Sequence, residues 1–142
     1  MTDVTPCNSR VYRLAVSGTA AELDPTQCAF EIQKHVHRYA KGYEVCVIAG
    51  LSNSLDDLVA NVARDCGLKT LRLGPAAQQG SKRAVFACNE RIVALSNGLL
   101  LFTGTTDFAT RHLLDAAYFR ELDISITAPT SVPANHYLTE CA

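Results

Sequence analysis

The chain has 142 residues, a length that fits one domain. Hydrophobic residues make up 48% of it and charged residues 19%, a balance that excludes a disordered protein. Thirteen basic residues stand against fourteen acidic ones, and this near-neutral charge argues against a dedicated nucleic-acid binder, which usually carries a basic stripe.

Strand and helix patterns alternate along the chain. A strand is predicted at 12–16, then a helix that begins at 25 and is ended by Gly42, then a strand at 44–49. A helix ended by Gly67 follows, then a short strand at 69–73 and a helix at about 82–95. The last predicted elements are a strand at 99–102, a helix that reaches about 119, and a strand at 124–128.

Helix starts are predicted from capping residues. Asp24, which precedes a proline, is expected to cap the first helix with its carboxylate. Ser52 or Ser54 is expected to cap the second helix, and Thr106 or Asp107 the fourth.

Five strands with intervening helices predict an α/β protein with a three-layer Rossmann-like fold. Its mostly parallel five-stranded sheet would carry helices on both faces. The strand at 99–102 is apolar at every position, which is typical of a strand buried on both faces. We expect residues 1–142 to form a single domain, with tails at 1–9 and 129–142.

Glycine and hydroxyl residues follow three of the predicted strands, each time just before a helix. They are Ser17-Gly18-Thr19, Gly50-Leu51-Ser52 and Gly104-Thr105-Thr106. The carboxyl ends of parallel strands share one rim of the sheet, and helix N-termini there offer unpaired amide donors. The three junctions therefore predict a site for a phosphate or another anion. Tight turns and helix capping are the alternative explanation of the same residues.

Basic residues near this rim are candidates for neutralising a bound anion. Lys82 and Arg83 stand at the start of a helix, where the dipole disfavours cations unless an anion lies nearby. A solvated helix end is the alternative for both.

The cysteines and histidines do not form a recognisable metal or redox motif. None of the six cysteines is paired as C-x-x-C, so reduced and mostly buried thiols are favoured over a disulfide framework or a metal site. His35 and His37 are two apart on a helix and point to different faces. We predict no metal and no cofactor.

Export and membrane insertion are also disfavoured. Residues 1–10 contain no apolar stretch of the signal-peptide kind, and no segment is apolar over the length of a bilayer. We expect a cytoplasmic protein without membrane contact.

Several segments resemble the SLOG superfamily, which is Rossmann-like and includes the DNA-processing protein A family, the Lonely Guy phosphoribohydrolases and small nucleotide-sensing domains. The resemblance covers about residues 10–128. It rests on Ile48-Ala49-Gly50, Asp56, Cys66-Gly67, Leu71-Arg72-Leu73, the segment 89–102, and Thr103-Gly104-Thr105-Thr106 in place of a glycine-rich loop. It implies a nucleotide ligand, with Asp56 on a ribose hydroxyl and Asn89 at a matching site position. It also implies self-association as a homodimer or higher homo-oligomer.

Catalytic residues of that superfamily are replaced in this chain. The family arginine falls on Cys88, the aspartate before the fourth strand on Asn97, and the glutamate of the phosphoribohydrolases on Ala109. Without a carboxylate to handle a proton, cleavage of an N-glycosidic bond lacks its machinery. The resemblance therefore implies a nucleotide-type ligand more firmly than a reaction.

Three hypotheses of function follow. The first is a small non-enzymatic protein that senses or sequesters a phosphorylated, ADP-ribose-like signalling nucleotide. The second is a nucleotide N-glycosidase with relocated catalytic residues, drawn from Glu90, Arg91 and Asp107. The third is a single-stranded DNA binder, against which the net charge of −1 argues.

Overall fold

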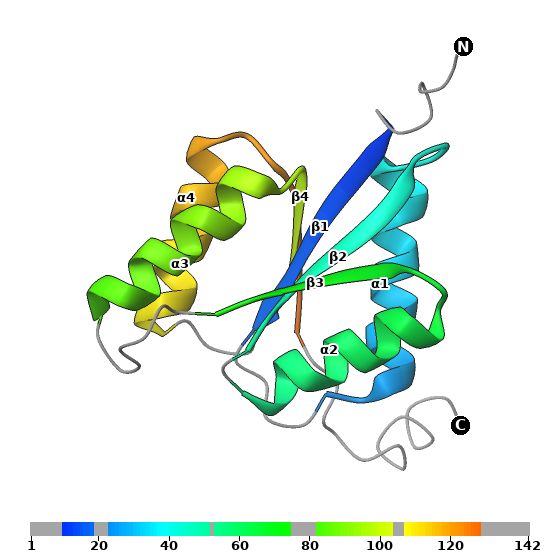
Figure 1. Cartoon of the computed structure of the whole chain (residues 1–142), viewed down its shortest axis with the longest axis horizontal. Helices are drawn as coiled ribbons and strands as arrows, with labels where there is room; N and C mark the ends of the chain where they lie inside the picture. The colour runs from blue at the N-terminus through cyan, green and yellow to red at the C-terminus, as the bar shows by residue number, and fades with distance from the viewer. Residues whose placement is uncertain (1–9, 19–22, 52, 75–81, 104–106, 129–142) are drawn as a thin grey trace, which may run out of the picture.

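The computed structural model describes residues 10–18, 23–51, 53–74, 82–103 and 107–128 (Figure 1). Its strands are β1 (Val11–Gly18), β2 (Glu44–Gly50), β3 (Lys69–Leu73), β4 (Gly98–Phe102) and β5 (Asp123–Thr127). Its helices are α1 (Pro25–Tyr39), α2 (Ser54–Asp65), α3 (Lys82–Leu95) and α4 (Phe108–Phe119).

The strands form one sheet in the order β3-β2-β1-β4-β5, and every pairing in it is parallel. The chain starts in the middle, runs to the β3 edge and then returns to place β4 beside β1. The strand order therefore reverses between β1 and β4. Helices α1 and α2 cover one face of the sheet and α3 and α4 the other (Figure 1). This arrangement confirms the predicted three-layer Rossmann-like fold.

Strand β4 is the centre of the core. All five of its residues are buried. Leu100 and Phe102 pack into the cluster under α1 and α2, whereas Leu99 and Leu101 pack into the cluster under α3 and α4. Successive side chains of a strand point to opposite faces, so a strand covered on both faces is apolar throughout.

Two of the predicted helix caps are wrong. Asp24 is the residue before α1, but its side chain makes no capping hydrogen bond, and the proline at the first helical position sets the start instead. Helix α2 is capped by Asn53, not by Ser52 or Ser54, because Asn53 has the extended backbone of a cap and Ser54 is already helical. For α4, the second of the two predicted caps, Asp107, is the one found.

The buried face of α3 also differs from the expectation. Helical spacing of the apolar residues predicts a buried stripe of Val85, Cys88, Ile92 and Leu95, whereas the buried residues are Cys88, Asn89 and Val93. Leu95 is exposed. The stripe is rotated because α3 packs against α4 as well as against the sheet.

A series of buried and half-buried polar side chains is hydrogen-bonded near the amino ends of the strands. The Tyr12 hydroxyl donates to Asp123 Oδ2 at 2.9 Å and lies 3.1 Å from His35 Nε2. Since that hydroxyl proton is already used, His35 Nε2–H donates to the Tyr12 oxygen. His35 Nδ1, 2.7 Å from Ser125 Oγ, then accepts from the serine. A Cβ at Gly98 would lie 2.3 Å from the Tyr12 hydroxyl, so glycine makes room for this chain.

This hydrogen-bond chain predicts a pH dependence of stability. Burial lowers the pKa of His35 to about 4; Asp123 opposes this shift, and Arg38 adds to it. An unfolded histidine titrates near 6.5, so between about pH 6.5 and 4 the unfolded state takes up a proton that the folded state does not. The free energy of unfolding should therefore fall as the pH drops through this window, by up to about 3 kcal/mol.

Urea unfolding at pH 7 and pH 4.5 measures this loss, and His35→Gln should remove this part of it because glutamine does not titrate. His37→Gln, an exposed position on the same helix, is the matched control and should keep the wild-type slope. An equal loss in wild type and His35→Gln would contradict the assignment.

Candidate functional site

A cleft of about 150 Å³ opens at the carboxyl ends of β1 and β2, beside the point between β1 and β4 where the strand order reverses. In open α/β sheets, ligands bind at this position. The starts of α2 and α4 and one face of α3 form its other walls. Its polar lining consists of Ser17, Asn53, Asp56, Asn89, Asp107 and Thr110, beside Gly18 and Gly50. Its apolar lining includes Leu73, Val85, Ile92 and Leu113.

Both glycines of the cleft are required by close packing. A Cβ at Gly18 would lie 1.9 Å from the carbonyl oxygen of Phe102, its partner in the β1–β4 pairing. A Cβ at Gly50 would lie 2.7 Å from Asp56 Oδ2. Glycine at the end of β2 therefore lets the carboxylate of Asp56 lie against the strand.

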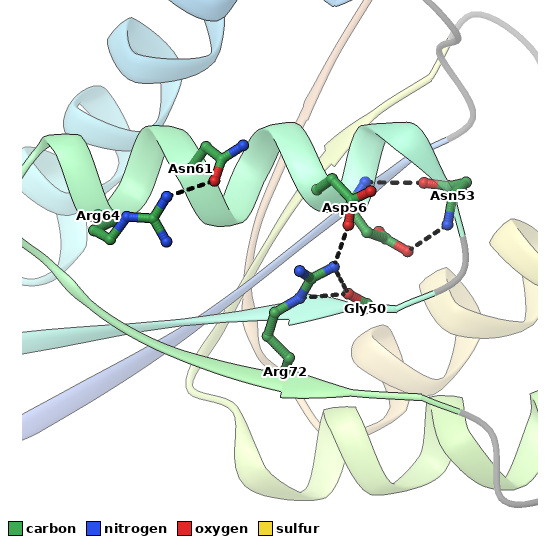
Figure 2. Close-up of polar contacts among 7 residues, drawn as sticks. Gly50, Asn53, Asp56, Asn61, Arg64 and Arg72 are labelled. Atoms are coloured by element: carbon green, nitrogen blue, oxygen red, sulfur yellow. Dashed lines mark hydrogen bonds and ion pairs between the residues drawn. The ribbon is translucent and has the colours of Figure 1, made fainter.

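Asp56 is fixed by a capping box at the start of α2 (Figure 2). Asn53 Oδ1 accepts from the Asp56 amide at 2.9 Å, and the Asn53 amide donates to Asp56 Oδ2 at 3.3 Å. These reciprocal bonds satisfy donors that a helix start leaves unpaired. The Asp56 residue is only 5% exposed, and that remaining surface lies in the cleft.

Arg72 ties β3 to the same corner (Figure 2). Its guanidinium donates to the carbonyl oxygen of Gly50 from Nε at 3.1 Å and from Nη2 at 2.8 Å. Nη2 also lies 2.8 Å from Asp57 Oδ1, in a hydrogen-bonded ion pair. The planar fork of arginine thus joins the end of β2 to the first turn of α2.

The forked contact of Arg72 predicts that replacing it with lysine costs more stability than the same replacement at Arg64. Arg72→Lys should lower the free energy of unfolding by about 1 kcal/mol, because an ammonium cannot reproduce the forked contact. Arg64→Lys is the matched control: Arg64 Nη2 donates only to the exposed Asn61 side chain, at 2.7 Å (Figure 2). Urea unfolding compares the two variants, and equal losses would refute the role given to Arg72.

Asn89 joins α3 to the start of α4. Its side-chain amide donates to the carbonyl oxygen of Ala109 at 3.0 Å and lies 3.3 Å from His112 Nδ1. At the beginning of α4, Asp107 Oδ1 accepts from the Thr110 amide at 2.7 Å. Asn89 and Asp107 therefore stabilise the start of α4 and its contact with α3, and both residues also line the cleft.

The charge of the cleft differs from what an anion site would need. Asp56 and Asp107 are carboxylates, and the lining residues that the structure describes include neither lysine nor arginine. The backbone amides of Asp56 in α2 and Thr110 in α4 already donate to the side chains that cap these helices. Such a lining suits hydroxyl groups, which donate to carboxylates, better than it suits a phosphate.

Cys88 also lines this cleft. Burial raises its pKa; Arg91 opposes that shift, and Asp56 adds to it. The side chain is buried. A thiol of this kind is a poor nucleophile, because the thiolate is the reactive form.

The remaining predicted site residues either do not line the cleft or fall outside the described residues. Lys82 and Arg83 are exposed and do not line the cleft. Leu51 is exposed and packs beside Gly74. Thr19, Ser52, Gly104, Thr105 and Thr106 lie outside the described residues.

Of the three residues named for a relocated catalytic set, Asp107 alone lines the cleft. Glu90 Oε2 lies 3.7 Å from His112 Nε2, and Arg91 Nη2 donates to the carbonyl oxygen of Gly74 at 3.4 Å.

Sequence reasoning missed Asn53, Arg72 and Thr110. The alternation of Leu71, Arg72 and Leu73 shows that Arg72 points to the opposite face from its neighbours, but not which groups it meets.

Within the described ranges, no helix is long and apolar enough to span a bilayer. In the same part of the chain, no three histidine, cysteine or acidic side chains gather as a metal site.

Comparison with known proteins identifies a fold but not a family. No protein-family model and no curated protein matches the chain. Among solved structures, DNA processing protein A from Streptococcus pneumoniae is similar, with a TM-score of 0.64 and 15% sequence identity. The match covers 93% of this chain and 57% of that protein. At this identity the likeness shows a Rossmann-like fold of the kind found in that protein, in agreement with the resemblance noted from the sequence.

Proposed function

We propose that this protein binds a nucleotide and holds its ribose in the cleft. One observation carries the proposal: a buried carboxylate, Asp56, faces a cleft at the point where the strand order of a parallel sheet reverses. Carboxylates accept hydrogen bonds from the paired hydroxyls of a ribose. Ser17 and Thr110, which also line the cleft, supply hydroxyl partners of their own.

The phosphate of the ligand is assigned to the segment between β4 and α4. The lining of the cleft offers two carboxylates and no cation among the described residues, so a phosphate is disfavoured inside it. The sequence of this segment contains Gly104, Thr105 and Thr106, which lie outside the described residues and are of the glycine and hydroxyl types that suit a phosphate. In this proposal the protein senses or sequesters a phosphorylated, ADP-ribose-like signalling nucleotide, and self-association as a homodimer or higher homo-oligomer stays a prediction.

Calorimetric titration of the full chain with AMP, ADP-ribose and ribose 5-phosphate tests the proposal. Asp56→Asn should weaken binding of all three by about tenfold, because a neutral amide replaces the charged acceptor. Asparagine still accepts the Asn53 amide, so the capping box is kept. Asp65→Asn, at the far end of α2, is the matched control and should bind normally. Flat titrations for every ligand, or unchanged binding by Asp56→Asn, would refute this function.

A second candidate function is hydrolysis of the N-glycosidic bond. It is favoured by one observation, that Asp107 lies in the same cleft as Asp56 and supplies a second carboxylate for proton transfer. Glu90 and Arg91 drop out of this candidate because they do not line the cleft. Chromatography after incubation with nucleoside monophosphates decides: release of free base, lost in Asp107→Asn, would establish an enzyme. Asparagine is also a good helix cap, so this variant keeps the start of α4.

Single-stranded DNA binding is the third candidate, and the name of the structural neighbour keeps it open. The net charge of −1 disfavours it. A gel shift that weakens steeply with salt would favour it over the nucleotide.

A further inference from the structure

We propose that the base of the nucleotide is a purine that stacks on Phe108, in a second hollow beside the cleft. This inference rests on the proposed function, because it places the part of the ligand that the cleft does not hold. It names the ligand as a purine nucleotide and assigns Phe108, Phe86 and Lys82 to a subsite for the base.

Size requires a second compartment. The cleft has a volume of about 150 Å³, whereas pockets for whole small-molecule ligands measure roughly 300–1,000 Å³. A ribose fits a space of this size, but a complete nucleotide does not. The base of any nucleotide whose ribose enters the cleft must therefore lie outside it.

A hollow of about 260 Å³ adjoins the cleft on the side of α3 and α4. Its lining residues are Lys82, Val85, Phe86, Asp107, Phe108 and Ala109. Val85, Asp107 and Ala109 belong to the walls of both spaces. The two spaces are therefore neighbours that share a wall at the start of α4, the arrangement that a ribose and its attached base need.

The hollow contains an aromatic surface. Phe108 is 58% exposed although it is a large apolar side chain, and the Phe86 ring meets it edge to face at 5.5 Å. Phe86 is in turn stacked on the His112 ring, with centroids 4.1 Å apart and planes at 14°. The stacking contact with His112 thus fixes the orientation of the Phe86 ring, and the Phe86 ring in turn contacts the Phe108 ring. Flat, oriented aromatic rings of this kind are what nucleobases stack on.

Lys82 adds a polar partner at the same place. Its ammonium nitrogen lies 4.4 Å from the centroid of the Phe108 ring, within the range of a cation–π contact. A purine carries several ring nitrogens that accept hydrogen bonds, and it offers a larger stacking surface than a pyrimidine. An ammonium beside an exposed ring therefore favours a purine. This position also gives Lys82, which does not reach the cleft, a role in ligand binding.

The chain contains a matched pair elsewhere. Phe30 on α1 is 62% exposed, and the Lys34 ammonium lies 5.9 Å from its ring. This pair is on the other face of the sheet and lines neither the cleft nor the adjoining hollow. It reproduces the exposure and charge of the Lys82–Phe108 pair without its position.

Calorimetric titration of the full chain with AMP and with ribose 5-phosphate tests the inference. Wild type should bind AMP more tightly than ribose 5-phosphate. Phe108→Ala should weaken AMP by about tenfold and leave ribose 5-phosphate unchanged. Phe108→Leu, which keeps apolar bulk and removes the ring, should give the same pattern and guards against a folding defect. Phe30→Ala should change neither ligand.

The outcomes separate this inference from the proposed function. Equal affinity of wild type for AMP and ribose 5-phosphate would overturn the base subsite and leave ribose binding in the cleft intact. Equal weakening of both ligands by the Phe108 variants would overturn it as well, because the ring would then support only the fold. If the Phe108 variants bind AMP normally but lose the binding of oligo-dA that wild type shows, the aromatic surface would belong to a single-stranded DNA site instead. If neither AMP nor ribose 5-phosphate binds wild type, the proposed function and the inference fall together.

Discussion

The pairing of β1 with β4 is the constraint on which the rest of the structure depends. Gly18 lies so close to the Phe102 carbonyl oxygen that no side chain fits between the two strands. This contact brings the end of β1 next to the strand that leads to α4, although the chain reaches β4 only after passing through the β3 edge. Because the connections leave β1 and β4 on opposite sides of the sheet, a space remains between them.

The two ends of the sheet use polar residues in opposite ways. At the amino ends, Tyr12, His35, Asp123 and Ser125 satisfy one another in a single hydrogen-bonded chain. At the carboxyl ends, Asp56, Asn89 and Asp107 make cap and helix contacts and also line the cleft. One end therefore stabilises the fold, and the other presents polar groups to a ligand.

The architecture was predictable because each element carries its own local pattern. Strand β3 and helix α3 begin and end at the predicted residues, and the fully apolar segment before α4 is the buried strand β4, which lies between β1 and β5. The caps were less predictable. Asn53, Ser52 and Ser54 are all good capping residues, and the choice among them depends on which residue has the extended backbone.

The site was predictable where topology alone decides it. Ser17, Gly18, Gly50 and Asp56 meet because parallel strands end on one rim. The contacts of the other residues near the site depend on tertiary packing. The first turn of α3 places Lys82 over Phe108 rather than in the cleft, and Arg72 on β3 reaches Gly50 on the neighbouring strand β2. Neither contact follows from spacing along the chain, because each joins residues that are more than twenty positions apart.

The central claim is that the cleft at the carboxyl ends of β1 and β2 receives the ribose of a nucleotide. The most direct measurement is a map of backbone amide chemical shifts by NMR during titration with AMP. The account predicts saturable shifts that cluster at Gly18, Gly50, Asp56, Asn89 and Thr110, the residues that line the cleft. Saturable shifts confined to α1, on the face of the sheet opposite α3 and α4, would contradict it.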